Sequence, residues 1–282
     1  MIVFCQYSAV IFINDHFRSF VKRYIMFKNQ RHCEILEILK RERFASVSDL
    51  SERLFASQPT IRRDLNFLEK QGYLRRSHGG AIPADERNNI PISFRSGTHT
   101  GQKTKICRLA ATLISDGSLI FTDASTTALH IANCIKQESN VTVLTNGYLA
   151  CKLFSDKGVR VFSTGGRLLA DSLAFVGESA RNTVSQYNAD IMFFSSSSLC
   201  EDGMISDYSE EETSLRICMA KMAKIKVFLC DETKFGKTSA FNLFPVSEVD
   251  YVVTGAPLPD AILKKYALEC ISDEEAFIYK KH

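Results

Sequence analysis

Two short amphipathic helices joined by a tight turn are the feature that most restricts how this chain can fold. Apolar residues recur every three or four positions in residues 46–55 and again in residues 57–70, the period of a helix with one buried face. Ser46 and Ser57 precede these segments, and a serine there can accept a hydrogen bond from a free backbone N–H. Two such helices with so short a connection predict a helix-turn-helix.

A further helix and a hairpin flank this pair. Residues 31–42 carry an apolar stripe of helical period, and Gly72 is placed to end the second helix of the pair. The sequence YLRRSHGGAIP follows, with strand-like residues on both sides of a Gly-Gly turn. Helix order, caps and hairpin together predict a winged helix-turn-helix over residues 28–83.

The second helix of the pair is expected to read DNA. Side chains at the start of a recognition helix reach base edges in the major groove, where arginine matches two acceptors of guanine. The wing beside it is expected to contact phosphates or the minor groove. Asp64 is expected to hold an arginine in place. The predicted DNA-binding residues are Ser57, Gln58, Thr60, Arg62, Arg63, Arg75, Arg76 and His78.

The charge of the chain is concentrated in this segment. The whole chain has a formal net charge of +3, from 35 Lys and Arg against 32 Asp and Glu. Residues 28–80 alone contain 11 basic and 7 acidic residues, a net of +4. A basic unit beside a near-neutral remainder indicates a polyanionic partner, here double-stranded DNA. A three-helix bundle that binds protein, with solvated arginines, is the alternative for the same pattern.

The remaining composition argues against metals and membranes. The nine cysteines form no CxxC and no metal-like spacing with histidine, which predicts reduced thiols, no structural metal and no cofactor. The apolar residues 1–13 are too few to span a bilayer. We expect Met26 to be the true start, with residues 1–25 a translated upstream stretch or a disordered tail. An amphipathic leader that touches a membrane is the alternative.

The rest of the chain predicts a larger α/β domain. Residues 84–101 are polar and contain proline and glycine, which predicts a linker. Helical and strand patterns alternate over residues 102–256, and this alternation predicts a largely parallel sheet with helices on both faces. Residues 1–27 are assigned as an N-terminal extension and residues 257–282 as a C-terminal segment.

Polar residues gather where the predicted strands end. In an open α/β sheet, ligands bind outside the carboxyl ends of the strands. Hydroxyls at a helix start, a glycine pair and a lysine there suit a small phosphorylated metabolite. The predicted effector site comprises Asp123, Ser125, Thr126, Thr127, Thr145, Asn146, Gly165, Gly166 and Lys234.

These motifs resemble those of the DeoR family of bacterial transcription regulators. TIRRDL at residues 60–65 and HGGA at residues 78–81 match its winged helix-turn-helix signature. DASTT, TN, GG and DETKFG match its sensor domain, with Ser125 in place of a glycine, and Glu212 and Arg216 stand where the family often has Glu and Lys. The resemblance runs from Met26 to about Gly255. It implies a sensor domain related in fold to ribose-5-phosphate isomerase and the coenzyme A transferases.

The resemblance also implies what the protein does. It indicates a cytoplasmic regulator, a repressor of sugar or carbohydrate metabolism genes, that binds its operator as a dimer or tetramer and responds to a phosphorylated sugar. The alternative is a sugar-phosphate isomerase, whose proton transfer needs a carboxylate base. Residues 195–203 read SSSSLCEDG, with serines where the acids of that enzyme would stand. We therefore expect no catalytic residues and no enzyme activity. An interaction module with a vestigial pocket is the third possibility.

Overall fold

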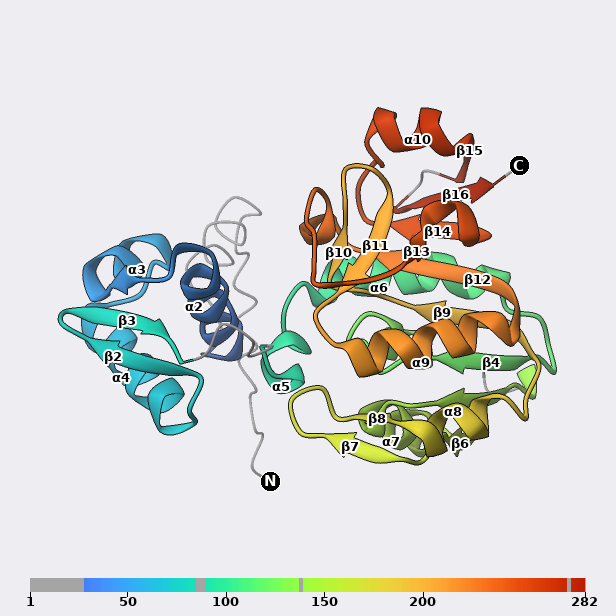
Figure 1. The fold of residues 1–282 in the computed structure, drawn as a ribbon, viewed down its shortest axis with the longest axis horizontal. Helices are drawn as coiled ribbons and strands as arrows, with labels where there is room; N and C mark the ends of the chain where they lie inside the picture. Colours follow the sequence, from blue (N-terminus) through green and yellow to red (C-terminus); the bar gives the residue numbers. More distant parts are fainter. Residues whose placement is uncertain (1–27, 85–89, 137–138, 273–274, 282) are drawn as a thin grey trace, which may run out of the picture. The chain divides into compact units, whose positions relative to one another are not determined.

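The computed structural model describes residues 28–84, 90–136, 139–272 and 275–281. The chain forms two compact units, Met1–Asn88 and Asn89–His282 (Figure 1). The expectations for residues 1–27, including the start at Met26 and the membrane-touching leader, lie outside the described residues. In the part of the chain that the structure describes, no helix is long and apolar enough to cross a membrane.

The described part of the first unit contains three helices and a three-stranded sheet. The helices are α2 (Lys28–Glu42), α3 (Val47–Arg53) and α4 (Gln58–Lys70). The strands are β1 (Ala45–Ser46), β2 (Leu74–Ser77) and β3 (Gly80–Pro83), paired antiparallel in the order β1-β3-β2 (Figure 1). This is the predicted winged helix-turn-helix, with β2 and β3 as the wing and α4 as the recognition helix.

The starts of α3 and α4 follow from their capping residues. Ser46 Oγ accepts a hydrogen bond from the Asp49 N–H at 3.0 Å, and Ser57 Oγ accepts one from the Thr60 N–H at 3.4 Å. Pro59 lies in the first turn of α4, where its missing N–H removes no helical hydrogen bond. Both predicted caps are therefore present.

The wing packs closely on the start of the helix pair. The turn between its strands contains Gly79 at a φ of +74°. A Cβ at Gly80 would lie 2.2 Å from the carbonyl oxygen of Ala45, so β3 can approach β1 only because this residue is glycine. The core of the unit consists of fully buried side chains that include Ile35, Leu50, Ile61, Leu65 and Leu68.

The second unit is built on an eight-stranded sheet in the order β15-β16-β14-β12-β9-β4-β5-β6 (Figure 1). The strands from β14 to β6 are parallel, and β16 and β15 extend the sheet antiparallel. Their bounds are β4 (Leu119–Thr122), β5 (Thr142–Thr145), β6 (Arg160–Ser163), β9 (Ala189–Phe194), β12 (Ala223–Cys230), β14 (Tyr251–Thr254), β15 (Leu268–Ser272) and β16 (Phe277–Lys281).

Helices cover both faces of this sheet and bury an apolar core against each. On one face lie α8 (Glu178–Val184) and α9 (Glu210–Lys221), and on the other lie α6 (Thr100–Ala110) and α7 (Tyr148–Asp156) (Figure 1). The predicted α/β fold class is confirmed. Because the parallel strands share one direction, their carboxyl ends meet along one edge of the sheet.

Several elements do not follow from the sequence pattern. A small second sheet contains β10 (Ser198–Leu199), β11 (Met204–Asp207) and β13 (Phe241–Pro245), and a hairpin contains β7 (Arg167–Leu169) and β8 (Ala174–Val176). Helix α5 (Ile92–Arg95) lies within the stretch predicted as a linker. Helix α10 (Asp260–Tyr266), β15 and β16 make the C-terminal segment part of the sheet unit.

The helix predicted after β4 is instead a 3-10 helix, Ala128–Asn133. Ser125 Oγ accepts a hydrogen bond from the Ala128 N–H at 3.1 Å. A side chain that accepts from the N–H three residues on has the geometry of a helix cap, so this segment keeps a capped start although it continues as a 3-10 helix.

Candidate DNA-binding and effector sites

The recognition helix presents two arginines on its exposed face. Ile61 and Leu65 are fully buried, whereas Arg62 and Arg63 beside them are exposed. Arg63 Nε donates a long hydrogen bond of 3.4 Å to the Pro59 carbonyl oxygen. Arg62 makes no hydrogen bond or ion pair with any described residue. Both guanidinium groups are thus open to a partner outside the unit.

Asp64 points the other way, into the core of the unit. Its Oδ2 accepts a hydrogen bond from Arg31 Nε at 2.5 Å, and its Oδ1 lies 2.9 Å from His32 Nε2. Burial raises the pKa of Asp64, but His32 and Arg31 together bring it below its ordinary value. The expectation that Asp64 holds an arginine agrees with this geometry, and the arginine is Arg31 of α2.

The wing is fastened to the recognition helix by Arg76. Its Nη1 donates to Asn66 Oδ1 at 2.5 Å and its Nε donates to the Gly80 carbonyl oxygen at 3.1 Å. The Arg76 backbone N–H donates to Glu69 Oε1 at 2.7 Å. This arginine, expected at DNA phosphates, therefore has partners within the protein, and Asn66 and Glu69 are residues that the sequence analysis did not single out.

The two other wing residues differ from Arg76. Arg75 is exposed, and its Nη2 donates to the Ala84 carbonyl oxygen at 3.1 Å. His78 is exposed at the turn. The wing tip therefore keeps exposed groups for a phosphate contact.

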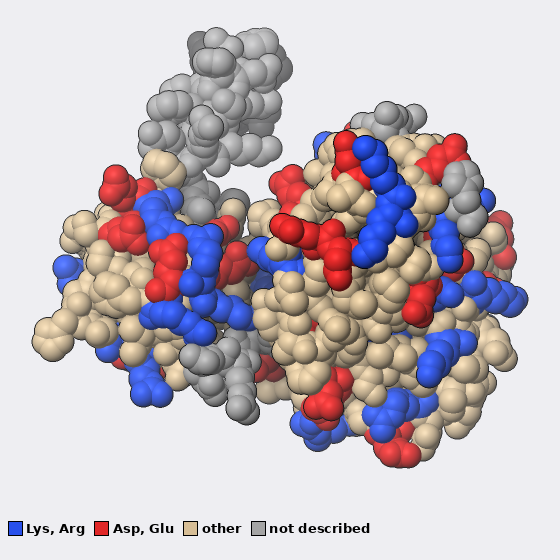
Figure 2. Space-filling model, turned by 45° about the horizontal axis from the view of Figure 1, so that its top comes forward, with Lys and Arg blue, Asp and Glu red and all other residues tan. Residues whose placement is uncertain are grey.

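Not all the basic charge of the first unit is open to a partner. Figure 2 shows lysines and arginines mixed with acidic residues on its visible face. Arg53 pairs with Glu42 at 2.7 Å, and Arg41 also donates to Glu42. Hydrogen bonds from Arg53 and then Arg41 lower the pKa of Glu42 to about 2. The unpaired charge therefore lies mainly on α4.

In the second unit, a buried ion cluster lies at the carboxyl ends of the strands, around Arg216 of α9. Its Nε donates to Asp123 Oδ2 at 2.7 Å, its Nη1 to Asp207 Oδ2 at 2.8 Å, and its Nη2 approaches Glu212 Oε2 at 3.3 Å. Burial lowers the pKa of Arg216, but the three carboxylates raise it above its ordinary value. For Asp207, burial raises the pKa. Other effects, of which the charge of Arg216 is the largest, bring this pKa below its ordinary value.

Asp123 also shapes the loop that follows β4. Its Oδ1 accepts from the Ser125 N–H at 3.1 Å and from Ser125 Oγ at 2.5 Å, and its Oδ2 accepts from the Ser195 N–H at 3.3 Å. The DASTT loop is therefore held by protein groups at its first and third positions.

Three predicted effector residues keep polar groups open at the same edge. The side-chain amide of Asn146 donates to the Phe175 carbonyl oxygen at 3.1 Å, while its buried Oδ1 has no hydrogen-bond partner among the described residues. The Thr126 hydroxyl and the half-buried Lys234 ammonium also make no hydrogen bond within the described ranges. A buried acceptor without a partner is rare in folded proteins and suits a ligand hydroxyl.

Comparison with known proteins assigns both units to the same family. A model of the DeoR-like helix-turn-helix domain matches residues 31–87, and a model of the DeoR C terminal sensor domain matches residues 98–256. The chain belongs to the DeoR family. This DeoR protein is thus a DNA-binding transcriptional regulator with a winged helix-turn-helix and a sensor domain.

Its relatives are named as regulators. The chain is 31% identical over 240 residues to the glycerol-3-phosphate regulon repressor of Escherichia coli K12, covering 85% of this chain and 95% of that protein. It is 31% identical to the regulator GolR of Listeria innocua, covering 86% and 96%, and 28% identical to the repressor AccR of Agrobacterium fabrum, covering 84% and 96%. The isomerase alternative finds no support among these relatives.

The sensor domain also has neighbours of the isomerase type among solved structures. Ribose 5-phosphate isomerase a from Methanocaldococcus jannaschii aligns at 16% identity and a TM-score of 0.37, covering 63% of this chain and 77% of that one. The Pyrococcus horikoshii translation initiation factor eIF-2B aligns at 12% identity and 0.40, covering 90% and 82%. At TM-scores this low, the likeness supports no further conclusion.

The four other predicted effector residues of the DeoR sensor domain differ in their surroundings. Thr145 Oγ1 accepts a hydrogen bond from the Gly147 N–H at 3.0 Å. Gly166 has a φ of +104°, and a Cβ there would lie 2.5 Å from the Val176 carbonyl oxygen, so β8 requires this glycine. At Gly165, with a φ of +62°, a Cβ would meet nothing within 4 Å. Thr127 is buried.

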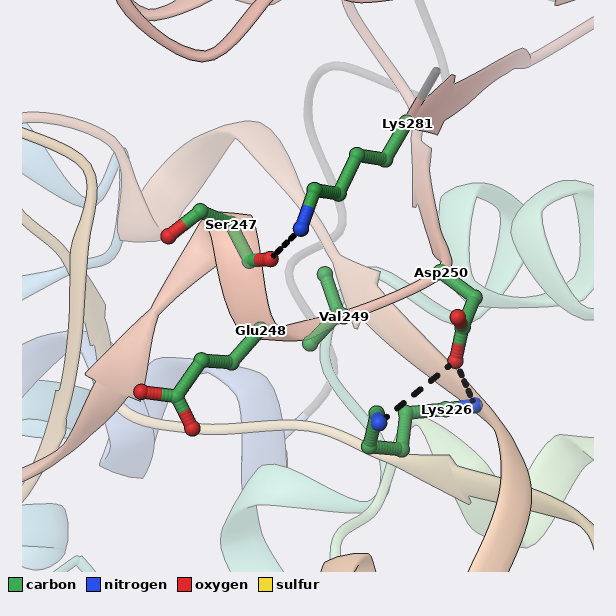
Figure 3. A pocket seen from close by; sticks show the side chains of 6 residues that line it. All are labelled: Lys226, Ser247, Glu248, Val249, Asp250 and Lys281. Atoms are coloured by element: carbon green, nitrogen blue, oxygen red, sulfur yellow. Dashed lines mark hydrogen bonds and ion pairs between the residues drawn. The ribbon is translucent and has the colours of Figure 1, made fainter.

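Two hollows lie at the opposite edge of the sheet, by the amino ends of its strands. One, of about 240 Å³, precedes β14 (Figure 3). There the Lys226 N–H donates to Asp250 Oδ2 at 2.8 Å and Lys281 Nζ donates to the Ser247 carbonyl oxygen at 2.7 Å, so Asp250 and Lys281 already have partners. The other, of about 840 Å³, precedes β5 and β6. Neither includes a predicted effector residue.

The described residues hold no group of three or more His, Cys, Asp or Glu side chains placed to bind a metal. Their cysteines, eight in number, are all free thiols. The sequence analysis named Arg216 and Ser195–Ser197 without expecting them beside Asp123, and it did not name Asp207. The four-residue spacing of Glu212 and Arg216, which puts both on one helix face, was the available signal.

Proposed function

We propose that this DeoR protein is a cytoplasmic repressor that releases its operator when a phosphorylated sugar or a derivative binds at the strand ends of the sensor domain. One observation carries the effector site. An ammonium, a hydroxyl and a buried amide oxygen, on Lys234, Thr126 and Asn146, make no hydrogen bond with described residues, whereas the side chains of Asp123, Ser125 and Thr145 at the same edge do.

The proposed ligand follows from these groups. Lys234 supplies a positive charge for a phosphate, and the Thr126 hydroxyl can donate to a phosphate oxygen. Asn146 Oδ1 can accept a hydrogen bond from a sugar hydroxyl. The name of the Escherichia coli relative makes glycerol 3-phosphate the first compound to test.

For the DNA side we propose that Arg62 and Arg63 contact bases, with Ser57, Gln58 and Thr60 beside them in the first turns of α4. Arg75 and His78 at the wing contact phosphates, and Arg76 holds the wing in position. A symmetric operator requires two such heads, so the binding species is a dimer or a tetramer.

The ion cluster favours sensing over catalysis. An isomerase needs a carboxylate free to take a proton from a carbon atom. Asp123 and Asp207 accept hydrogen bonds from Arg216. Burial raises the pKa of Asp207, but the charge of Arg216 is the main cause that brings it below its ordinary value. Asp207 is therefore a poor base, the Asp123 carboxylate is already bonded to Arg216, and we propose that the protein is not an enzyme.

The effector must act through linkage. A ligand shifts the equilibrium between a DNA-binding arrangement and a released one only by the difference in its affinity for the two. The proposal is tested by a thermal-shift panel of glycerol 3-phosphate and other sugar phosphates, together with an assay for turnover of ribose 5-phosphate. A compound that raises the melting temperature without turnover supports the sensor. Turnover of the sugar phosphate would contradict it.

A further inference from the structure

Residues 92–98, which begin the sensor domain, pack against it near the loop between β7 and β8. Helix α5 is the first described element after the wing strand β3 in the sequence. Ile92 and Phe94 of α5 are buried, with exposures of 4% and 7%. The Ile92 N–H donates to the Asp171 carbonyl oxygen, in the loop between β7 and β8, at 2.8 Å (Figure 1). This short helix is therefore part of the sensor domain and not a free tether.

A buried lysine also holds this stretch in place. Lys103 of α6 is 4% exposed, and its Nζ donates to the Arg95 carbonyl oxygen at 2.9 Å and to the Thr98 carbonyl oxygen at 2.8 Å. Arg95 is the last residue of α5 and Thr98 follows it; the Arg95 carbonyl oxygen also accepts from Thr98 Oγ1 at 2.9 Å, so Lys103 and Thr98 together hold the end of this helix. A buried ammonium is stable only with such partners, so Lys103 and the α5 stretch depend on each other.

The same lysine interacts with the effector edge. Burial raises the pKa of Asp231, and the charge of Lys234, a hydrogen bond from Thr233, and the charges of Lys103 and His99 bring it below its ordinary value. The geometry agrees: Gln102, next to Lys103 on α6, donates from Nε2 to Glu232 Oε1 at 2.7 Å, so this part of α6 lies against the loop that carries Asp231 and Lys234. The charge of Arg95, in α5, is also one of the effects that lower the pKa of Asp207 in the ion cluster.

We propose that Lys103 is a positioning residue that couples the effector site to the DNA-binding domain through α5. Negative charge bound beside Lys234 attracts the Lys103 ammonium and weakens its hold on the Arg95 and Thr98 carbonyls. The α5 stretch then loosens, and with it the attachment of the chain that leads to the winged helix-turn-helix. The inference rests on the proposed function, because it takes the effector to be an anion at the strand ends.

The first test uses the unaltered protein. Hydrogen exchange is followed by mass spectrometry for residues 92–98, whose amides bond within the α5 stretch or to Asp171, and for the strands β4 and β12 as an internal reference. A sugar phosphate that raises the melting temperature should speed exchange in residues 92–98 by about tenfold and leave the two strands unchanged. A bound compound that leaves this stretch unchanged or slows its exchange would overturn the proposal.

The second test needs no effector. Lys103→Met removes the ammonium, and Lys105→Met removes an exposed ammonium from the same helix as a matched control. The first variant should speed exchange in residues 92–98 about tenfold, weaken operator binding about tenfold and blunt any effector response, whereas the control should match the wild type. Lys103→Arg should restore part of the operator affinity.

The two proposals fail in different ways. If no sugar phosphate binds, the effector class is wrong, and the comparison of the two methionine variants still decides whether Lys103 couples α5 to DNA binding. Operator binding by Lys103→Met equal to the control, with β4 and β12 still protected from exchange, would overturn the coupling role alone.

Discussion

Replacing Arg216 by methionine should cost the sensor domain a large part of its stability at neutral pH. The substitution keeps most of the side-chain volume but leaves Asp123, Asp207 and Glu212 without their cation, and their side chains are only 1%, 9% and 9% exposed. Removing one partner of a buried ion pair costs roughly 3 to 5 kcal/mol, because a buried charge is left uncompensated. In a domain of this size that corresponds to a fall in melting temperature of about 10 °C.

The pH dependence distinguishes lost charge pairing from lost packing. In the wild type the pKa of Asp207 lies below its ordinary 3.8, so its pairing stabilises the fold above that value and is lost as the pH falls through the folded pKa. In Arg216→Met the desolvation by burial remains without the cation, so we expect the folded pKa values of the cluster to be raised. The destabilisation is then full at neutral pH and shrinks as the pH falls through those raised values.

Calorimetry or urea denaturation followed by circular dichroism measures both quantities. Arg181→Met is the matched control, because Arg181 is 39% exposed and its contact with Glu178 is 3.5 Å, for which a change under about 1 kcal/mol is expected. A loss in Arg216→Met no larger than in this control, or a loss that is the same at pH 4 and pH 7, would refute the reasoning.

Three further substitutions test the two sites. Arg63→Ala should weaken specific operator binding by roughly 1 to 3 kcal/mol and relax base preference, with Lys70→Ala at the far end of α4 as control; equal losses on operator and random DNA in an anisotropy titration would argue against a base contact. Arg76→Ala frees the wing from α4, so affinity should fall alike on operator and random DNA, and a fall on the operator alone would contradict a positioning role. Lys234→Ala should leave operator affinity intact and reduce the response to sugar phosphates at least about tenfold, whereas the exposed Lys237→Ala should respond as the wild type; lost operator binding would indicate a folding role instead.

The winged helix-turn-helix could be predicted because its signals are local. Helical period, the caps at Ser46 and Ser57, and the glycine turn of the wing all lie within a few residues of the structure that they specify. The parallel sheet followed in the same way, since each buried strand and each covering helix carries its own pattern. The carboxyl-end placement of Asn146 and Lys234 then followed from the strand direction alone.

The whole ion cluster could not be predicted, because Asp123 is far from the other three members in the sequence. Arg216 is separated by 93 positions from Asp123 and by 9 from Asp207, and no periodicity relates them. The sequence placed Asp123 at the ligand, while its carboxylate is occupied by Arg216 and Ser125. The hydrogen bond from Arg76 to Asn66 also could not be predicted, because it depends on how the wing packs against α4.

Short or irregular elements escaped prediction for a different reason. Helix α5 has only four residues, too few to show a helical period, and its position is set by contacts with residues far along the chain such as Asp171. The second sheet has strands of two to five residues, and β13 pairs with β11 across α9 and β12. Tertiary contacts decide such segments, not local preference.

Release of DNA by a sugar phosphate is tested most directly by fluorescence anisotropy of the full chain on the DNA upstream of its own gene, with random DNA as reference. The titration is made at two salt concentrations, with and without glycerol 3-phosphate and related sugar phosphates. Tight, salt-dependent binding that one of these compounds weakens at least about tenfold is the predicted result. Specific operator binding that none of them changes would contradict the regulation proposed here.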